Sequence, residues 1–226
     1  ALLDGLRARG VRATFFVCAY RVAQFPQTLC RAAQEGHEIG LHSCCHDYMQ
    51  NMCRDEAYND LVSCAQAVTE CCGLAPRLFR PPGGLYSSDL LAAAKDAGVS
   101  VILWSVDPED WKYRNADTVY ANIVNNSYDG CIILCHDVYK TTVDGALRAI
   151  DELQSQGYEF VTVEQLLTRR GITPENGVVY YDAKNNGINL PAGVSGSEYY
   201  DESKLSEHWA YDALTFCLDR GYLERD

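Results

Sequence analysis

Short apolar runs alternate with segments of helical period from Val11 to about Glu164, and this alternation constrains the fold more than any other feature. The expected strands are Val11–Val17, Glu38–Leu41, Arg77–Arg80, Val99–Trp104, Cys131–Leu134 and Glu159–Val161. The expected helices are Val22–Gln34, Arg54–Cys71, Ser88–Ala97, Asp117–Asn126, Thr142–Gln156 and Val163–Arg169. Because helices separate strands too distant for hairpins, the sheet should be mostly parallel. The repeated unit predicts a β/α barrel or an open doubly wound sheet.

A polar cluster follows each of four consecutive expected strands. The clusters are His42-Ser43-Cys44-Cys45-His46, Arg80-Pro81-Pro82-Gly83-Gly84, Asp107-Pro108-Glu109-Asp110-Trp111 and Cys135-His136-Asp137. A β/α barrel carries its chemistry at the carboxyl ends of its strands. We therefore expect all four clusters to meet at one rim. Dinucleotide-binding and P-loop glycine motifs do not occur in the sequence.

His42 and His46 are candidate metal ligands. If the chain makes one helical turn after Leu41, the four-residue spacing puts both imidazoles on one face. Neutral imidazoles suit a borderline metal such as zinc. Each cluster alone has a plainer reading: a capping histidine, a turn at Asp107-Pro108, a core Trp111, a surface ion pair at Arg80, or a core His136. Four clusters in succession make the plain reading improbable.

Composition narrows the possible partners. The net charge is −12, from 31 acidic against 19 basic residues among 226, and no basic cluster occurs. This disfavours nucleic acid or an anionic membrane as a partner. No apolar run reaches the roughly 18–20 residues that span a bilayer. Eleven cysteines occur without a CxxC pair, and Cys18, Cys131 and Cys135 lie in or beside apolar runs, as small core residues do.

Taken together, the clusters resemble the motifs of the polysaccharide deacetylase family, carbohydrate esterase family 4, from Ala1 to about Tyr181. The motifs H-[ST]-x-x-H, R-P-P-x-G, D-x-x-D-W and L-x-H-D match His42–His46, Arg80–Gly84, Asp107–Trp111 and Leu134–Asp137. Thr14-Phe15-Phe16 matches a further strand of the family. The resemblance implies an irregular parallel (β/α) barrel of the NodB-homology type.

The resemblance also implies a mechanism. His42 and His46 would bind Zn²⁺ or another divalent transition metal, which lowers the pKa of a bound water and polarises the acetamide. His136 would protonate the leaving amine, and Asp110 would orient its ring. Arg80 would pair with the catalytic base of the family. The remaining residues would contact substrate: the Gly83 N–H at the oxyanion, Trp111 and Leu134 around the acetyl methyl, Trp111 and Tyr86 on sugar rings, and Pro81, Pro82 and Gly84 in the adjoining loop.

One family motif, T-F-D-D-G, has no match in this sequence. In the family it supplies the catalytic base and the third zinc ligand on the first strand. We therefore expect a barrel that lacks its first strand and begins inside the domain, with open edges on the neighbouring strands and no partner for Arg80. Truncation is favoured over an inactive relative. Either way, zinc binding should be poor and turnover slow; Asp47 is a weak substitute ligand.

The expected organisation is a deacetylase domain at 1–181, a linker at 182–203 and a helix at 204–226. His208-Trp209-Ala210-Tyr211 opens this helix and is similar to the start of an S-layer homology module, which binds cell-wall polymers. A plain amphipathic helix packed on the barrel is the alternative.

The resulting expectation is a zinc-dependent hydrolase that removes N-acetyl groups from a cell-wall polysaccharide and is secreted or wall-associated. Peptidoglycan N-acetylglucosamine is the first substrate, chitin-like oligomers the second and O-acetyl xylan the third. The alternatives are a non-catalytic glycan-binding relative and a metal-dependent amidase acting on a small molecule.

Overall fold

The computed structural model describes residues 1–184 and 213–219, and for 213–219 it describes the backbone. The helices are α1 (Leu2–Ala8), α2 (Ala19–Gln24), α3 (Pro26–Gln34), α4 (Arg54–Cys72), α5 (Ser88–Asp96), α6 (Asp110–Tyr113), α7 (Ala116–Asn126), α8 (Lys140–Ser155) and α9 (Val163–Arg169). Short 3₁₀ turns lie at Met49–Asn51 and Pro82–Gly84. The strands are β1 (Thr14–Val17), β2 (Glu38–Leu41), β3 (Leu78–Phe79), β4 (Ser100–Ile102), β5 (Ile132–His136), β6 (Glu159–Val161), β7 (Val179–Tyr180) and β8 (Ala213–Asp219).

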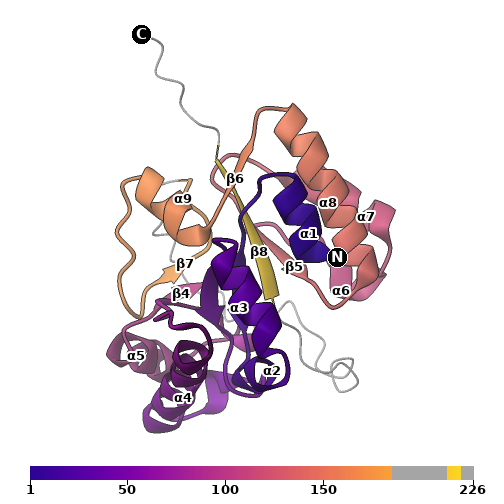
Figure 1. Ribbon diagram of the computed structural model, residues 1–226. Coiled ribbons are helices and arrows are strands. Elements are labelled where there is room, and N and C mark those ends of the chain that lie inside the picture. The colour runs from indigo at the N-terminus through magenta and orange to yellow at the C-terminus, as the bar shows by residue number, and fades with distance from the viewer. Residues whose placement is uncertain (185–212, 220–226) are drawn as a thin grey trace.

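The sheet has the order β5-β8-β1-β2-β3-β4-β7, with β6 also paired to β8. Neighbours from β1 through β4 to β7 run parallel, as the alternation of strands and helices predicts. Beyond β4, the N–H groups of Ser105 and Val106 donate to the Ile132 carbonyl at 3.0 and 3.1 Å, and the Leu134 N–H donates to the Val106 carbonyl at 2.9 Å. The chain after β4 therefore runs beside β5, the strand at the other end of the order. Figure 1 shows the helices arranged around these strands.

Strand β8 lies between β1 and β5 and pairs antiparallel with both (Figure 1). The expected helix is therefore wrong at 213–219, where the structure has a strand, and the expected open edges of β1 and β5 are covered. Exposed strand edges are templates for a further strand, and this long-range pairing outweighs the local helical pattern. The remainder of the expected helix, and of the expected linker beyond Lys184, lies outside the described residues.

The single helix expected at Val22–Gln34 is two helices, α2 and α3. Phe25 between them has φ −132° and ψ 51°, and Pro26 opens α3. The proline ring disfavours helical geometry at the residue before it and suits the first position of a new helix. The sequence contained this signal in Phe25-Pro26.

The strands separate two apolar clusters. Alternate strand residues point to opposite faces: Phe15 packs in the cluster beneath the surrounding helices, and Phe16 packs in the inner cluster. Three residues of α9 join the inner cluster, namely Val163, Leu166 and Leu167. Cys18, Cys131 and Cys135 are buried, which confirms their expected place in the core. Among the described residues, no helix combines the length and apolar character that crossing a bilayer requires.

Candidate functional site

The carboxyl ends of β2, β3 and β5 deliver the candidate histidines and Arg80 to one neighbourhood. His42 follows β2 directly, Arg80 follows β3, and His136 ends β5. The Nδ1 atom of His42 lies 2.7 Å from the carbonyl oxygen of Arg80. The charges of His46 and His136 both act on His42, so the three imidazoles are electrostatic neighbours. The sequence prediction that these strand ends meet is thus reproduced in space.

His42 is 4% exposed and held as a neutral ring. Burial, followed by the neighbouring His46, lowers its pKa well below the ordinary value of 6.5. With a proton on Nδ1, the ring donates to the Arg80 carbonyl and presents the lone pair of Nε2. A histidine whose other nitrogen is held by a carbonyl is the usual arrangement of a metal ligand.

The turn that joins His42 to His46 is not the expected helical turn. Ser43 and His46 have φ values of +67° and +65°, and the Ser43 Oγ accepts the His46 N–H at 2.8 Å. The two imidazoles still meet edge to face, with ring centroids 4.9 Å apart. Burial, and then the charge of His136, lowers the pKa of His46. Two neutral imidazoles therefore sit side by side on a strained, hydrogen-bonded turn.

This pair has the donor atoms of part of a metal site. Within residues 1–184, no group of three or more His, Cys, Asp or Glu side chains is placed to hold a metal ion. Neutral imidazoles are suitable donors, but catalytic zinc sites take three protein ligands. Asp47, the suggested substitute, is exposed. The described residues thus offer suitable donor atoms for a divalent metal, but fewer ligands than a full zinc site has.

The half-buried His136 pairs with the buried Asp110. The Nδ1 of His136 lies 2.8 Å from Asp110 Oδ1, and the His136 backbone N–H donates to Oδ2 at 2.7 Å. Burial alone would raise the pKa of Asp110, but the charge of His136 and the hydrogen bonds that Asp110 accepts bring that pKa below its ordinary value. Asp110 is thus held as a carboxylate that accepts from the imidazole ring, and its expected catalytic role stays a prediction.

Sequence reasoning missed Thr142, which completes this pair. Its Oγ1 donates to Asp110 Oδ2 at 2.8 Å in a buried position. Thr142 lies in the first turn of α8, six residues after His136. Nothing local in the sequence marks this contact, because Asp110 reaches it from a separate helix, α6.

Arg80 is buried, at 1% exposure, which rules out the plainer reading as a surface ion-pair residue. Its Nε donates to the Ile102 carbonyl at 3.1 Å and its Nη2 to the Leu103 carbonyl at 2.8 Å. Its guanidinium carbon lies 4.3 Å from the centroid of the Phe16 ring. Arg80 therefore ties the end of β3 to β4.

The loop after Arg80 needs both of its glycines. Gly83 and Gly84 have φ values of +66° and +71°, which favour glycine. A Cβ on Gly83 would lie 2.6 Å from the Tyr48 ring, and one on Gly84 would lie 2.8 Å from the Trp104 ring. Tyr48 and Trp104 thus adjoin the site, and the sequence analysis did not select them. The paired glycines were the only local sign of a close approach.

The other expected contact residues differ in exposure. Pro82 is buried, Trp111 and Tyr86 are half-buried, and the Tyr86 hydroxyl lies 3.1 Å from that of Tyr181. Leu134 is 2% exposed and belongs to the inner apolar cluster. The substrate-binding roles of these residues, and of Pro81, stay predictions.

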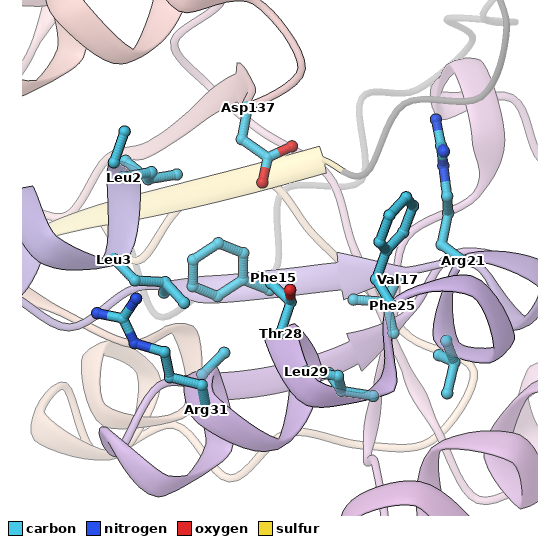
Figure 2. Close-up of a pocket in the computed structure, with 13 residues that line it drawn as sticks. Leu2, Leu3, Phe15, Val17, Arg21, Phe25, Thr28, Leu29, Arg31 and Asp137 are labelled. Carbon is cyan, nitrogen blue, oxygen red and sulfur yellow. The ribbon is translucent and has the colours of Figure 1, made fainter.

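A cavity of about 330 Å³ lies on the outer side of β1, between α1 and α3. Figure 2 shows Phe15 at its centre, Leu2 and Leu3 on one side and Asp137 above. None of the three candidate histidines lines it. This cavity is therefore separate from the histidine cluster, although Asp137 directly follows His136.

The geometry defines an α/β protein with a histidine pair and a histidine–carboxylate pair where parallel strands end. The model of the polysaccharide deacetylase family matches residues 1–102. A peptidoglycan-N-acetylglucosamine deacetylase of Bacillus cereus is 37% identical over 171 residues, covering 74% of this chain and 80% of the relative. The chain therefore belongs to the polysaccharide deacetylase family.

Two further matches show the extent of the likeness. Peptidoglycan-N-acetylglucosamine deacetylase PgdA of Listeria monocytogenes is 39% identical over 181 residues, covering 80% of this chain and 38% of that protein. The chain thus corresponds to well under half of that longer relative. The solved structure of peptidoglycan deacetylase PdaC from Bacillus subtilis aligns with a TM-score of 0.72 at 38% identity, covering 75% of this chain and 83% of that one.

Proposed function

We propose that this chain carries the hydrolytic domain of a metal-dependent deacetylase that removes N-acetyl groups from a cell-wall polysaccharide. The observation that carries the proposal is the pair of buried Asp110 and half-buried His136 beside two neutral imidazoles. Family membership and the names of the relatives, which are peptidoglycan deacetylases, support the polymer class. Peptidoglycan N-acetylglucosamine is the first substrate, followed by chitin-like oligomers.

His42 and His46 would hold the metal, Zn²⁺ or another divalent transition ion. A metal bound there supplies Lewis acidity, which polarises the acetamide carbonyl and lowers the pKa of a water molecule. The tautomer of His42 is set by the Arg80 carbonyl, so its Nε2 is ready to coordinate. Because two ligands are fewer than a catalytic zinc site takes, we expect weak zinc affinity and slow turnover.

His136 would act as the general acid. Its Nδ1 is bonded to Asp110, so Nε2 is the atom that would give a proton to the amine as the carbon–nitrogen bond breaks. The Asp110 carboxylate holds the orientation of the ring through Nδ1. The reaction consumes one water, and the products are acetate and a glucosamine unit.

The test is acetate release from N-acetylglucosamine oligomers and from peptidoglycan, with and without added Zn²⁺. We expect slow, chelator-sensitive release that His136→Gln and Asp110→Asn each abolish. Glu70→Gln, on the exposed face of α4, is the matched control and should behave as wild type. Zinc-independent release, or full activity in His136→Gln, would contradict the proposal.

A non-catalytic glycan-binding role is the second candidate. The observation that favours it is the partial ligand set, in which no third donor joins the two imidazoles within residues 1–184. Oligosaccharide binding by calorimetry without any acetate release, even at saturating zinc, would select this candidate.

Secretion or attachment to the cell wall is part of the proposal, because the substrate is a wall polymer. Immunodetection in the wall and culture fractions would test it. Binding of the 204–226 region to wall polymers is a separate proposal that lies largely outside the described residues.

A further inference from the structure

Two cysteine side chains from different helices face each other on the side of the molecule formed by α3 and α4. The Sγ atoms of Cys30, in α3, and Cys71, in the last turn of α4, lie 3.7 Å apart. The Cys30 thiol also donates to the Cys71 carbonyl at 3.2 Å. Neither residue belongs to the candidate site, and 41 positions separate them in the chain.

The contact is accessible to small reagents. Cys30 and Cys71 are half-buried, whereas Cys18, Cys64, Cys131 and Cys135 are buried. An oxidant in solution can therefore reach this pair more readily than the core thiols. Cys45 and Cys53 are more exposed, but Cys30 and Cys71 are the pair whose Sγ atoms are shown in contact, at 3.7 Å.

The two sulfurs must approach further for a disulfide to form. A disulfide requires an S–S distance of about 2.05 Å, so the two atoms must close the remaining gap by rotation of their side chains. Cys71 lies two residues before Gly73, which ends α4 with φ +73°, and helix ends adjust more easily than helix centres. The adjacent Cys72 is turned elsewhere, because its thiol donates to the Val68 carbonyl at 3.3 Å.

We propose that Cys30 and Cys71 are a cross-linking site, at which a small-molecule disulfide of the glutathione type oxidises the pair to a disulfide that joins α3 to α4. One thiolate attacks a sulfur of oxidised glutathione and releases one glutathione thiolate. The second cysteine, as thiolate, then attacks the mixed disulfide and releases the other. Two protein thiols are oxidised, one glutathione disulfide is reduced to two thiols, and no other reactant is required.

The reaction should be slow at neutral pH and faster in mild alkali. Burial, and then the neighbouring Cys30, raises the pKa of the Cys71 thiol to about 11, and the thiolate is the reactive form. The bond would close a loop that contains β2, His42 and His46. Since a cross-link of this kind restricts the unfolded chain, we expect the melting temperature to rise by roughly 5–10 °C.

The test compares the full chain with Cys30→Ser, Cys71→Ser and Cys72→Ser after incubation with oxidised glutathione at pH 8.5. Free thiols are alkylated, the protein is digested, and fragmentation of the linked peptide distinguishes Cys71 from Cys72. We expect a Cys30–Cys71 link and the thermal shift in wild type and Cys72→Ser. Both should be absent in Cys30→Ser and Cys71→Ser.

The reduced melting temperature of each variant shows whether the serine itself disturbs folding. Mapping of the link to Cys71–Cys72 or Cys30–Cys72 would overturn the proposal. So would complete alkylation of Cys30 and Cys71 after prolonged oxidation. Acetate release plays no part in these measurements, so the outcome is independent of the proposed function.

Discussion

Glu38 offers a pH-dependent stability that can be worked out from the structure. It begins β2, where its Oε2 accepts the Thr14 hydroxyl at 2.6 Å and the Glu164 N–H at 3.3 Å. Burial outweighs these hydrogen bonds and, with the charge of Glu164, raises the pKa of Glu38 from 4.5 to about 7. The folded protein therefore holds a proton on Glu38 more tightly than the unfolded chain does.

The sign and size of the effect follow from linkage. A carboxyl whose pKa is raised by folding favours the folded state fully below pH 4.5, and this contribution is lost as the pH rises to about 7. A shift of roughly 2.5 pKa units corresponds to about 3 kcal/mol as an upper limit. Glu38→Gln keeps an oxygen acceptor for Thr14 and Glu164 and removes the titration.

Urea unfolding at pH 5 and pH 8 measures this difference. We expect Glu38→Gln to gain about 2–3 kcal/mol in free energy of unfolding, relative to wild type, between the two pH values. Glu159→Gln is the matched control, because Arg169 lowers the pKa of Glu159 and any small pH effect should have the opposite sign. A wild-type-to-Gln difference that is constant within about 0.5 kcal/mol across this range would refute the reasoning.

Three further predictions concern the candidate site. Thr142→Val should lower kcat for acetate release about tenfold with little change in KM, because the hydroxyl bond to the Asp110 carboxylate is lost. Thr142→Ser regains the hydroxyl and should restore kcat, whereas unchanged kcat in Thr142→Val would show that the bond is dispensable. Gly84→Ala should destabilise the fold by about 2–4 kcal/mol in urea unfolding, and Gly73→Ala by about 1 kcal/mol. Both glycines have positive φ, but only at Gly84 would the added Cβ meet the Trp104 ring, at 2.8 Å. Equal losses of stability in the two variants would contradict the role given to Trp104. Zn²⁺ at 100 times its dissociation constant should raise the free energy of unfolding by about 2.7 kcal/mol. His42→Ala should abolish this stabilisation, and Cys45→Ser, in the same turn, should keep it. Stabilisation that persists in His42→Ala would place the ion elsewhere.

Much of the fold could be predicted because its signals are local. The strands Glu38–Leu41 and Glu159–Val161 and the helix Val163–Arg169 have the predicted bounds. Each is a short apolar run or a capped helix whose limits are set by neighbouring turn residues. In contrast, β8 exists through its pairing with β1 and β5, so no local pattern at 213–219 could reveal it.

The candidate site divides in the same way. The sequence could predict that the candidate residues directly following a strand lie near one another, because parallel strands bring their carboxyl ends to one edge. Thr142 and Tyr48 were missed, because they reach the site from α8 and from the loop before α4, through contacts that depend on tertiary packing. The expected helical turn at His42–His46 is wrong because Ser43 and His46 have left-handed backbone angles and the Ser43 hydroxyl accepts the His46 N–H.

The two halves of the candidate site differ in how completely they are built. The acid half has all of its supports: the backbone and ring of His136 and the hydroxyl of Thr142 converge on a carboxylate that has no exposure. The proposed metal ligands are two rings held as neutral donors, and we expect ligand count to limit metal affinity there more than geometry does. Orientation of His136 should therefore be insensitive to metal, whereas zinc affinity should respond to any added carboxylate near His42 and His46. If the proposed function holds, we therefore expect metal affinity, and not placement of His136, to set the turnover of this chain.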